Sequence, residues 1–425
     1  MCTAQLTRQY IAILEEELIP AMGCTEPIAL AYAAALARKT LGVLPEQAEL
    51  AVSANIIKNV KSVIVPNTGN LRGIEAAAAA GFVAGDPERE LEVLSRVTGE
   101  QIPQIRAYLE QTPIQVRTSD SDFVFDIQVL VSAGEHRAFV QIAGNHTNVI
   151  RMEKDGQVLL RRDYEERGQT QHTDHSVLNV ADIIDFADTV SIDSVKDVLD
   201  RQIRCNTAIA QEGLTGNWGA SIGKVLLKAY GDSVHNRAKA WAAAGSDARM
   251  SGCEMPVVIN SGSGNQGLTA SLPVILYAEH LQASRELLYR ALLVSNLITI
   301  HLKTGIGCLS AYCGATSAGC GAGAGITYLY GGKAREISHT IVNAVAINSG
   351  MICDGAKPSC AAKIASAVEA GLLGMQMQMQ GTEFFGGDGI VVKGVENTIN
   401  NVGRLARVGM AETDKEIIQI MIGSC

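Results

Sequence analysis

The sequence predicts an α+β fold, with a large, mostly helical Gly/Ala-rich domain and a smaller antiparallel-sheet-containing α/β domain inserted near the N-terminus. Three observations support this class. The first 42 residues have helical spacing, residues 113–163 alternate apolar and polar side chains, and the chain beyond about 178 is helical with Gly-rich breaks. We therefore expect N-terminal helices in 1–44 that pack with the helical domain, a small α/β domain in 45–165, and the helical domain in 166–425.

The N-terminal part begins with two expected helices. Apolar residues recur at helical spacing within 5–18, and the alanine-rich segment 28–42 ends at Gly42, a residue typical of helix C-termini. Beyond them we expect, in order, a strand, an irregular segment and a second strand within 48–69 closed by a Pro-Asn-Thr-Gly turn, a small-residue helix at 72–81, and an amphipathic helix at about 86–110.

Segments with strand-like alternation follow and predict three or four antiparallel strands. They are PIQVRTSD, DFVFDIQVLVSAG, HRAFVQIAG and TNVIRMEKDGQVLLRRD. The polar stretch 167–177 is expected to be a loop. Glycine occurs 42 times and aromatic residues make up only 4% of the chain, so small residues should let the helices pack closely.

Composition excludes several classes of protein. The formal net charge of −9 and the lack of a basic stripe argue against a nucleic-acid partner. The longest apolar stretch, residues 291–302, is too short to span a membrane. The N-terminus lacks the features of a signal peptide, so we expect a cytoplasmic protein with no membrane partner. Thiols stay reduced in the cytoplasm, which makes a disulfide framework from the ten cysteines improbable.

Three segments place cysteine beside glycine and small polar residues: MGCTEP (22–27), GCLSAYCGATSAGC (307–320) and GMICDGAKPSCAAK (350–363). Glycines allow close approach to a bulky group, and their N–H groups can bond cluster sulfides. Cys353 and Cys360 can turn toward one centre, and Ser359 can cap the following helix, so that its dipole favours a Cys360 thiolate. Thiolates select zinc or iron–sulfur centres, and the short paired spacing of structural zinc sites does not occur here. The residues alone leave a cluster and inert core thiols as open alternatives.

Other cysteines allow different interpretations. Cys205 and Cys253 are expected to be small buried hydrophobes. Cys24 precedes the helix at 28–42, and a helix N-terminus lowers the pKa of a thiol and is a usual place for a reactive cysteine. The alternative is a cysteine packed under the turn where the helix begins.

Taken together, eight short segments resemble the L-cysteine desulfidase family, which is related to the iron–sulfur L-serine dehydratases of the alpha-chain type. They occur in order along nearly the whole chain: GCTEP, PNTG, GNHTN, QEGLTGNWG, SDARMSG, NSGSGNQG, SAYCGA and SGMICDGAKPSCAAK. The resemblance implies an oxygen-sensitive [4Fe-4S] cluster and conversion of L-cysteine to pyruvate, ammonia and hydrogen sulfide without pyridoxal phosphate.

The resemblance also implies roles for individual cysteines. Cys313, Cys353 and Cys360 would be the cluster ligands, leaving one iron open, and Cys24 would be the active-site thiol. Cys308 and Cys320 receive no role, although Cys320 lies seven residues beyond Cys313 and is a fallback ligand.

Elimination from cysteine requires removal of the Cα proton and stabilisation of the leaving sulfide. An open iron can act as the Lewis acid, and Cys24 or His146 could take the proton. The fourth iron position could be occupied by Cys24, substrate, water or the C-terminal Cys425.

Polar residues in turns are the expected partners of the substrate's carboxylate and ammonium groups. They are Asn67, Thr68, Asn145, His146, Asn148, Ser261, Ser263 and Asn265. Arg249 and Lys357 could also neutralise a carboxylate, although a surface role is more common for such residues.

Three rival interpretations stay open. Residues 262–267 spell G-x-G-x-x-G after the strand-like MPVVIN, as in dinucleotide sites, but Pro273 should interrupt the following helix and no second strand follows. An L-serine dehydratase would use the same cluster on a different leaving group. A non-enzymatic redox-sensing protein would not need the reactive-looking Cys24. Small-residue helix surfaces make a homodimer reasonable.

Overall fold

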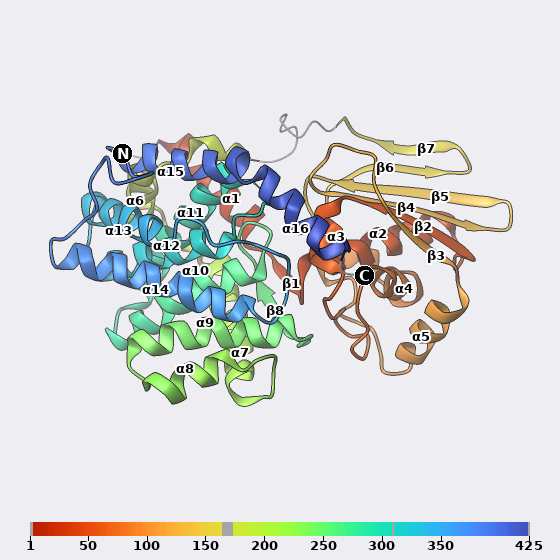
Figure 1. Cartoon of the computed structure of the whole chain (residues 1–425), viewed down its shortest axis with the longest axis horizontal. Helices are drawn as coiled ribbons and strands as arrows, with labels where there is room; N and C mark the ends of the chain where they lie inside the picture. The colour runs from red at the N-terminus through yellow and green to blue at the C-terminus, as the bar shows by residue number, and fades with distance from the viewer. Residues whose placement is uncertain (1–2, 164–172, 308–309, 424–425) are drawn as a thin grey trace.

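A six-stranded sheet with helices on one face forms one lobe of the molecule, and a bundle of helices forms the other (Figure 1). The computed structural model describes residues 3–163, 173–307 and 310–423. This arrangement confirms the predicted α+β class. None of the helices within these ranges combines the length and apolar character needed to cross a lipid bilayer.

The sheet of the small lobe is mixed, with the strand order β3-β2-β4-β5-β6-β7. Its strands are β2 (Gln47–Val52), β3 (Ile114–Thr118), β4 (Asp126–Ala133), β5 (His136–Ala143), β6 (Val149–Lys154) and β7 (Gln157–Arg161). All neighbours are antiparallel except β2 and β3, which are parallel, so the expectation that the segment PIQVRTSD forms an antiparallel strand is wrong. The alternation of apolar and polar residues predicts which side chains pack against the helices, but it carries no information about strand direction.

Alternation along β4 explains why one face of the sheet is covered. Ile127, Val129 and Val131 are buried on the helical side, whereas Leu130 between them is 38% exposed on the other. Leu50 of β2 lies opposite Val129, which lies opposite Val140 of β5, so apolar residues are in register across three strands.

Helix α2 (Thr25–Leu41) belongs to the small lobe, which corrects its expected place with the helical domain. It ends at Gly42 in the left-handed conformation, as predicted. Because α2 is apolar on almost every side, it is buried between the sheet and α4 (Ile74–Ala84). A Cβ at Gly81 of α4 would meet the backbone of Ala31. The pattern predicts the burial of this helix but not which surfaces bury it.

Helix α1 (Ala4–Glu17) does pack on the large lobe, as expected. The Tyr10 hydroxyl donates to the carbonyl oxygen of Val177 at 3.1 Å, and its ring meets Phe186 edge-on, with centroids 5.2 Å apart. Between α1 and α2, strand β1 (Pro20–Met22) pairs with β8 (Pro256–Val258) in a two-stranded antiparallel sheet. The chain therefore enters the small lobe beside the segment that leads into α10.

Two expectations for the small lobe are wrong. The second strand expected within 48–69 is replaced by α3 (Ala54–Val60) and turns, with a single bridge between Ile64 and Arg72. Val63 and Val65, whose apolar character suggested a strand, are buried without belonging to one. The helix expected at about 86–110 is a 3₁₀ helix at Pro87–Glu92, turns, and α5 (Gln101–Gln111). Glu90 has a positive φ of 46°, which breaks the helical path.

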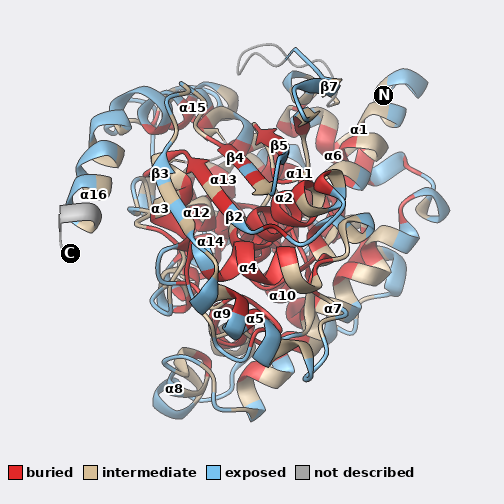
Figure 2. Cartoon of the chain, turned by 90° about the vertical axis from the view of Figure 1, so that its right-hand side faces the viewer, coloured by how far each residue is buried: buried red, intermediate tan, exposed pale blue. Residues whose placement is uncertain are grey.

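The large lobe consists of helices that pack closely around one another. They are α6 (Val180–Thr189), α7 (Lys196–Thr215), α8 (Ile222–Tyr230), α9 (Val234–Met250), α10 (Gly264–His280), α11 (Arg285–Ile306), α12 (Gly314–Leu329), α13 (Ala334–Ile347), α14 (Cys360–Met379) and α15 (Val395–Arg404). Helix α16 (Ala411–Gly423) then returns to the small lobe and contacts α3. Viewed from the small lobe, buried residues gather at the centre and α8 and α16 lie at the periphery (Figure 2).

Helix α10 passes through Pro273, although the sequence analysis expected the proline to interrupt it. A proline inside a helix costs roughly 3 kcal/mol, and here the residue is buried in a helix that packs against several others, which stabilise the helical path. The preceding strand β8 pairs antiparallel with β1, so residues 262–267 do not lie in the parallel βαβ unit of a dinucleotide site.

Glycines hold α12 and α14 in close parallel contact. Gly319 lies against Ala367 and Gly323 lies against Gly371, so both helices run in the same direction. A Cβ at any of these glycines would overlap the backbone of the opposite helix. As a result, the N-termini of α12 and α14 lie at the same end of the bundle.

Substitution of Gly371 by Ala tests this contact. The added methyl group would meet the carbonyl oxygen of Gly319, and we expect the free energy of unfolding to fall by about 1–3 kcal/mol. Gly305→Ala in α11 is the control, since its Cβ would be at an ordinary 3.4 Å from Gly403 and alanine favours a helix. Equal stability of both variants in urea denaturation would contradict the close packing.

A pH-dependent ion-pair cluster links α9 to α14. Glu369 accepts from His235 at 2.9 Å and pairs with Lys239 at 2.7 Å, which lowers its pKa from 4.5 to about 2 although burial opposes the shift. A lowered carboxyl pKa stabilises the folded chain above about pH 4.5, and this contribution is lost as the pH falls toward 2.

We therefore expect Glu369→Gln to lower the free energy of unfolding at pH 6 by at most about 1 kcal/mol, because the side chain is half-exposed and screened. Chemical denaturation at pH 3 should show a smaller difference from the wild-type protein than at pH 6. Glu412→Gln, which removes an exposed pair with Lys415, is the control and should be close to neutral at both pH values. A difference that does not change with pH would contradict the assignment.

Candidate active site

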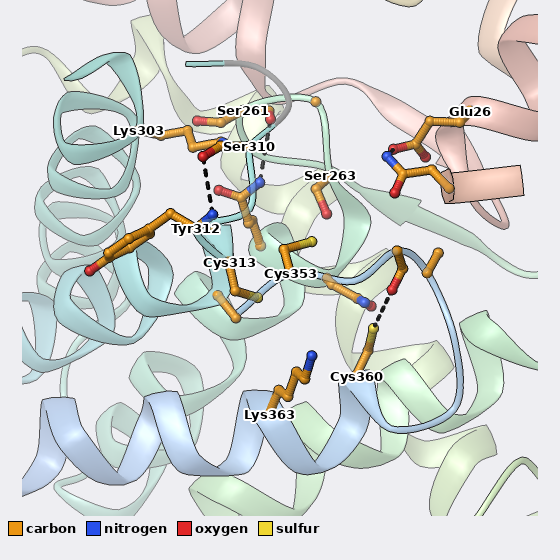
Figure 3. Close-up of a pocket in the computed structure, with 18 of the residues that line it drawn as sticks. Glu26, Ser261, Ser263, Lys303, Ser310, Tyr312, Cys313, Cys353, Cys360 and Lys363 are labelled. Carbon is orange, nitrogen blue, oxygen red and sulfur yellow. Dashed lines mark hydrogen bonds between the residues drawn. The ribbon is translucent and has the colours of Figure 1, made fainter. Parts of the chain in front are cut away.

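A cavity of about 110 Å³ lies where the small lobe meets the N-terminal ends of α10, α12 and α14. Pockets for drug-sized ligands have roughly 300–1,000 Å³, so this one suits a smaller ligand. Residues of α2 and α3 form the wall on the small-lobe side, and three cysteines form part of the opposite wall (Figure 3).

Four helices begin at or beside this cavity. Cys24, Ser263, Cys313 and Ser359 are the N-cap residues of α2, α10, α12 and α14, and none of their side chains bonds a helix N–H group. The expected cap by Ser359 is therefore wrong, because its backbone is already helical, with φ −64° and ψ −11°. Uncapped N–H groups and helix dipoles make this end of the bundle electropositive.

A short antiparallel bridge brings Cys313 and Cys353 together. The N–H of Cys313 donates to Met351 at 2.9 Å, and the N–H of Cys353 donates to Ala311 at 2.7 Å. Their thiols are neighbours in the cavity wall (Figure 3). The interaction between the two thiols lowers the pKa of Cys353, helped by the Lys58 and Lys303 cations, and raises the pKa of Cys313.

Cys360 completes the group from the first residue of α14. Its thiol donates to the carbonyl oxygen of Gly355 at 3.8 Å and faces the same cavity (Figure 3). Burial raises the pKa of Cys360, and the neighbouring Cys353 adds to the shift. The cavity therefore gathers the three cysteines that the resemblance assigned to a cluster.

The donor set fits a multi-iron centre better than a single ion. Among the described residues, no three His, Cys, Asp or Glu side chains come close enough to hold one metal ion. In a cluster each thiolate binds a different iron, so the ligands lie further apart than around one zinc. Two of the three cysteines, Cys313 and Cys360, adjoin helix N-termini, but the pKa of each is raised, so the thiolate expected at Cys360 from the helix dipole is wrong because burial dominates.

Cys24 is the N-cap of α2 as predicted, but its surroundings differ from the expectation. The thiol is buried, lies 4.0 Å from the sulfur of Met250, packs beside Cys360 and does not line the cavity. Burial raises the pKa of Cys24 to about 12, although Arg249 acts in the opposite direction. The expected lowering of this pKa by the helix N-terminus is wrong, because loss of hydration dominates.

The predicted substrate-binding residues fall into two groups. Those that line the cavity are His146, Ser261, Ser263 and Asn265. Those that do not are Asn67, Thr68, Asn145 and Asn148.

The second group bonds to nearby backbone instead. Asn67 and Thr68 each donate to a carbonyl oxygen at 2.7 Å, and Asn145 accepts from two following N–H groups. Polar turn residues often satisfy local backbone in this way.

His146 is a neutral base candidate in the cavity wall. It is only 6% exposed, and its Nε2 has no hydrogen-bond partner among the described residues. Its ring packs edge-on against Phe125, with centroids 4.9 Å apart. Burial lowers the pKa of His146, with Glu26 opposing the shift, so the ring is neutral at pH 7.

Several unsatisfied polar atoms adjoin the N-terminus of α10. Arg249 Nε, Asn265 Oδ1 and Gln266 Oε1 are buried without a partner among the described residues, and all three residues line the cavity. Buried polar groups without partners are rare and often await a ligand or water. Arg249 is buried at the cavity, whereas a surface position seemed more common from the sequence.

Glycines make room for these side chains. A Cβ at Gly314 would lie 2.5 Å from the Gln266 side chain, and one at Gly264 would overlap Arg249. Both glycines stand in motifs noted in the sequence, but nothing there indicated which side chains they admit.

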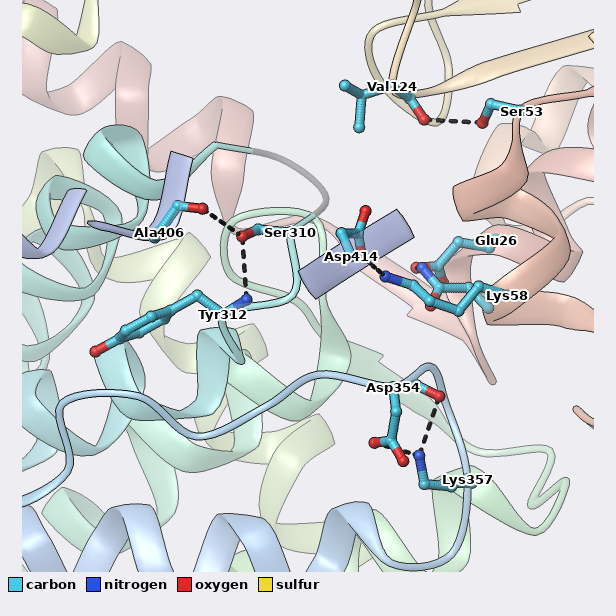
Figure 4. Close-up of polar contacts among 11 residues, drawn as sticks. Glu26, Ser53, Lys58, Val124, Ser310, Tyr312, Asp354, Lys357, Ala406 and Asp414 are labelled. Carbon is cyan, nitrogen blue, oxygen red and sulfur yellow. Dashed lines mark hydrogen bonds and ion pairs between the residues drawn. The ribbon is translucent and has the colours of Figure 1, made fainter. Parts of the chain in front are cut away.

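Three lysines that the sequence analysis missed also line the cavity, and each has a fixed partner. Lys58 pairs with Asp414 of α16 at 2.5 Å (Figure 4), Lys363 pairs with Asp354 at 2.5 Å, and Lys303 donates to the carbonyl oxygen of Gly307. Lys357, in contrast, pairs with Asp354 and does not line the cavity. These cations favour an anionic ligand.

Other cysteines lie elsewhere. Cys320 is buried in α12 and does not line the cavity, because seven residues advance a helix by roughly 10 Å. Cys205 and Cys253 pack in or against the core, as predicted. Cys308 and Cys425 lie outside the described residues.

Comparison with known proteins identifies the family of the chain. Residues 88–419 match the family described as serine dehydratase alpha chain. The chain belongs to the serine dehydratase alpha chain family. This family supports a lyase-type enzyme with an iron–sulfur centre, and the predicted relationship to iron–sulfur L-serine dehydratases is confirmed at this level.

Relatives that match over nearly their whole length are named only as UPF0597 proteins, a name that states no activity. A UPF0597 protein of Desulfitobacterium hafniense is 59% identical over 416 residues, covering 98% of this chain and 97% of the relative. UPF0597 proteins of Lachnoclostridium phytofermentans and Actinobacillus pleuropneumoniae serotype 3 are 50% and 39% identical, covering 98% and 99% of this chain and 99% and 98% of the relatives. The narrower L-cysteine desulfidase relationship stays a prediction.

The cysteine loop contacts the small lobe at Gly355, and substitution there tests this contact. Gly355 has φ +91°, and a Cβ would lie 2.5 Å from the carbonyl oxygen of Lys58. We expect Gly355→Ala to lower the free energy of unfolding by about 2–4 kcal/mol, from backbone strain plus the clash.

Gly381→Ala is a matched control, because Gly381 has φ +70° but nothing within 4 Å of its Cβ position. Its free energy of unfolding should fall only by the backbone strain, about 1–2 kcal/mol. Equal losses in chemical denaturation would mean that the contact with Lys58 contributes nothing.

Proposed function

We propose that this protein is an iron–sulfur lyase that eliminates sulfide from L-cysteine and yields pyruvate, ammonia and hydrogen sulfide. The observation that carries the proposal is the convergence of Cys313, Cys353 and Cys360 on one small, electropositive cavity between the lobes. Family membership supports the reaction class, and the resemblance of the motifs supports cysteine as the substrate.

In this proposal, Cys313, Cys353 and Cys360 hold a [4Fe-4S] cluster, and no pyridoxal phosphate takes part. When bound, the cluster would supply an iron with an open coordination position that acts as a Lewis acid on the substrate. The lysines and helix N-termini around the cavity lower the cost of placing thiolates there. Each lysine has its own partner, so these charges stay in fixed positions.

His146 is the proposed acceptor of the Cα proton. It lines the cavity, is neutral at pH 7 and has an unpartnered Nε2, as a general base requires. Cys24, the base expected from the sequence, would have to lose its proton against burial and has no surface in the cavity wall. We therefore assign the role of proton acceptor to His146. Cys24 is treated as a thiol that packs beside the proposed ligand Cys360.

The substrate carboxylate is proposed to bind at the N-terminus of α10. Arg249 offers a buried guanidinium there, and Ser263 and Asn265 offer polar side chains beside it. Uncapped N–H groups of the helix add further donors. Enclosure between the two lobes limits water around the reacting atoms, which strengthens these interactions.

L-Serine dehydration is the second candidate, favoured by the name of the family. The same cluster and base would serve, with water instead of sulfide as the leaving group. Thiophilic iron favours cysteine, and relative kcat/KM values for the two amino acids decide between them.

Anaerobic purification tests the centre and the reaction together. We expect about four irons and four acid-labile sulfides per chain, and release of pyruvate and sulfide from L-cysteine. Substituting Ser for Cys313, Cys353 or Cys360 should remove most of the iron and abolish activity. Cys205→Ser, which changes a half-buried thiol on α7 away from the cavity, should keep both. Absence of iron after reconstitution would contradict the proposal.

A further inference from the structure

Glu26 is the one carboxylate among the described residues that line the cavity. It is the second residue of α2 and faces the cysteine wall from the small-lobe side (Figure 3). Four cationic side chains share the cavity with it, those of Lys58, Lys303, Lys363 and Arg249. Glu26 is therefore the one place in the described cavity wall where a positively charged group of a ligand meets a carboxylate.

Neutral partners hold the Glu26 carboxylate in place. Asn59 of α3 donates its Nδ2–H to Oε1 at 3.1 Å. The hydroxyl of Thr25 lies 3.0 Å from Oε2 and also 3.0 Å from the carbonyl oxygen of Gly262, and its single hydrogen can serve only one of them. An ionised carboxylate accepts about four hydrogen bonds, so Glu26 keeps at least two acceptor sites, and these two neighbours leave its charge uncompensated.

An acidic residue in the first turn of a helix often does no more than stabilise the helix. Glu26 differs from such residues because a side chain from another helix orients it and because it borders the cavity beside His146, whose pKa it raises against the effect of burial. Glu75, the second residue of α4, has the common arrangement: it is exposed and does not line the cavity.

We propose that Glu26 binds the α-ammonium group of the substrate and makes the site selective for α-amino acids over ligands that lack the amino group. This inference rests on the proposed function. An ammonium bound at Glu26 and a carboxylate bound at Arg249 would fix two of the substituents on Cα. The remaining two, the hydrogen and the β-carbon with its leaving group, then have defined directions, which elimination requires.

The test compares two ligands that differ only in the amino group. Anaerobically purified holoenzyme is assayed with L-cysteine as substrate and 3-mercaptopropionate as competitive inhibitor. Glu26→Gln keeps the shape of the side chain and removes its charge. A hydrogen bond to a charged group contributes roughly 1.5–3 kcal/mol. We therefore expect kcat/KM for L-cysteine to fall by about 10- to 150-fold, while the inhibition constant of 3-mercaptopropionate stays within about twofold.

Two further variants keep the result interpretable. Glu26→Asp retains the charge and should recover part of the preference for the amino acid, which a purely structural role would not explain. Glu75→Gln removes a charge at the same position of another helix and should leave both constants unchanged. Thermal unfolding and iron content of each variant establish that fold and cluster are intact.

Equal weakening of both ligands in Glu26→Gln, or no change in either, would overturn the inference. If the wild-type protein turned over neither L-cysteine nor L-serine, the proposed function would fail instead. Calorimetric titration with the same pair of ligands would then still test Glu26, because equal affinity of the wild-type protein for both would overturn its role in ammonium binding.

Discussion

Close packing of α12 against α14 is the contact on which the candidate site depends. Both helices begin at the cavity and run parallel, and their contact is made by Gly319, Gly323 and Gly371 without intervening side chains. Because the helices are this close, the segments that precede them can pair through the Tyr312–Ile352 bridge, which sets Cys313 beside Cys353. The glycine content that looks like mere compositional bias therefore determines how far apart the cysteines lie.

Positive and negative charges are unevenly distributed around the cavity. Helix N-termini and four cationic side chains surround the space, and each lysine among them is fixed by a partner. Glu26 is the one carboxylate among the described residues that line this space. A zwitterionic amino acid matches such a site better than a simple anion, because it presents one charge of each sign to opposite walls.

Neither lobe forms the site by itself. Glu26, Lys58 and Asn59 come from α2 and α3, whereas the cysteines and Arg249 come from the helical lobe. The lobes are joined at the cavity by the contact of Gly355 with Lys58 and by the buried pair between Lys58 and Asp414, which α16 carries back to the small lobe (Figure 4). Residues far apart in the chain thus enclose a single small space, which is how water is limited around a reacting substrate.

Local chemistry in the sequence determined the α+β class, the helix at 28–42 with Cys24 at its start and the strand-forming segments, whereas resemblance to a family through short motifs singled out Cys313, Cys353 and Cys360. Each depends on periodicity, capping residues or motifs that act over a few residues. Tertiary structure alone decided the rest: the parallel pairing of β2 with β3, the burial of α2 in the small lobe, the raised pKa of Cys24, and the meeting of Glu26, Lys58 and Arg249. These depend on burial and on charges brought together from distant segments, and neither leaves a periodic signal in the chain.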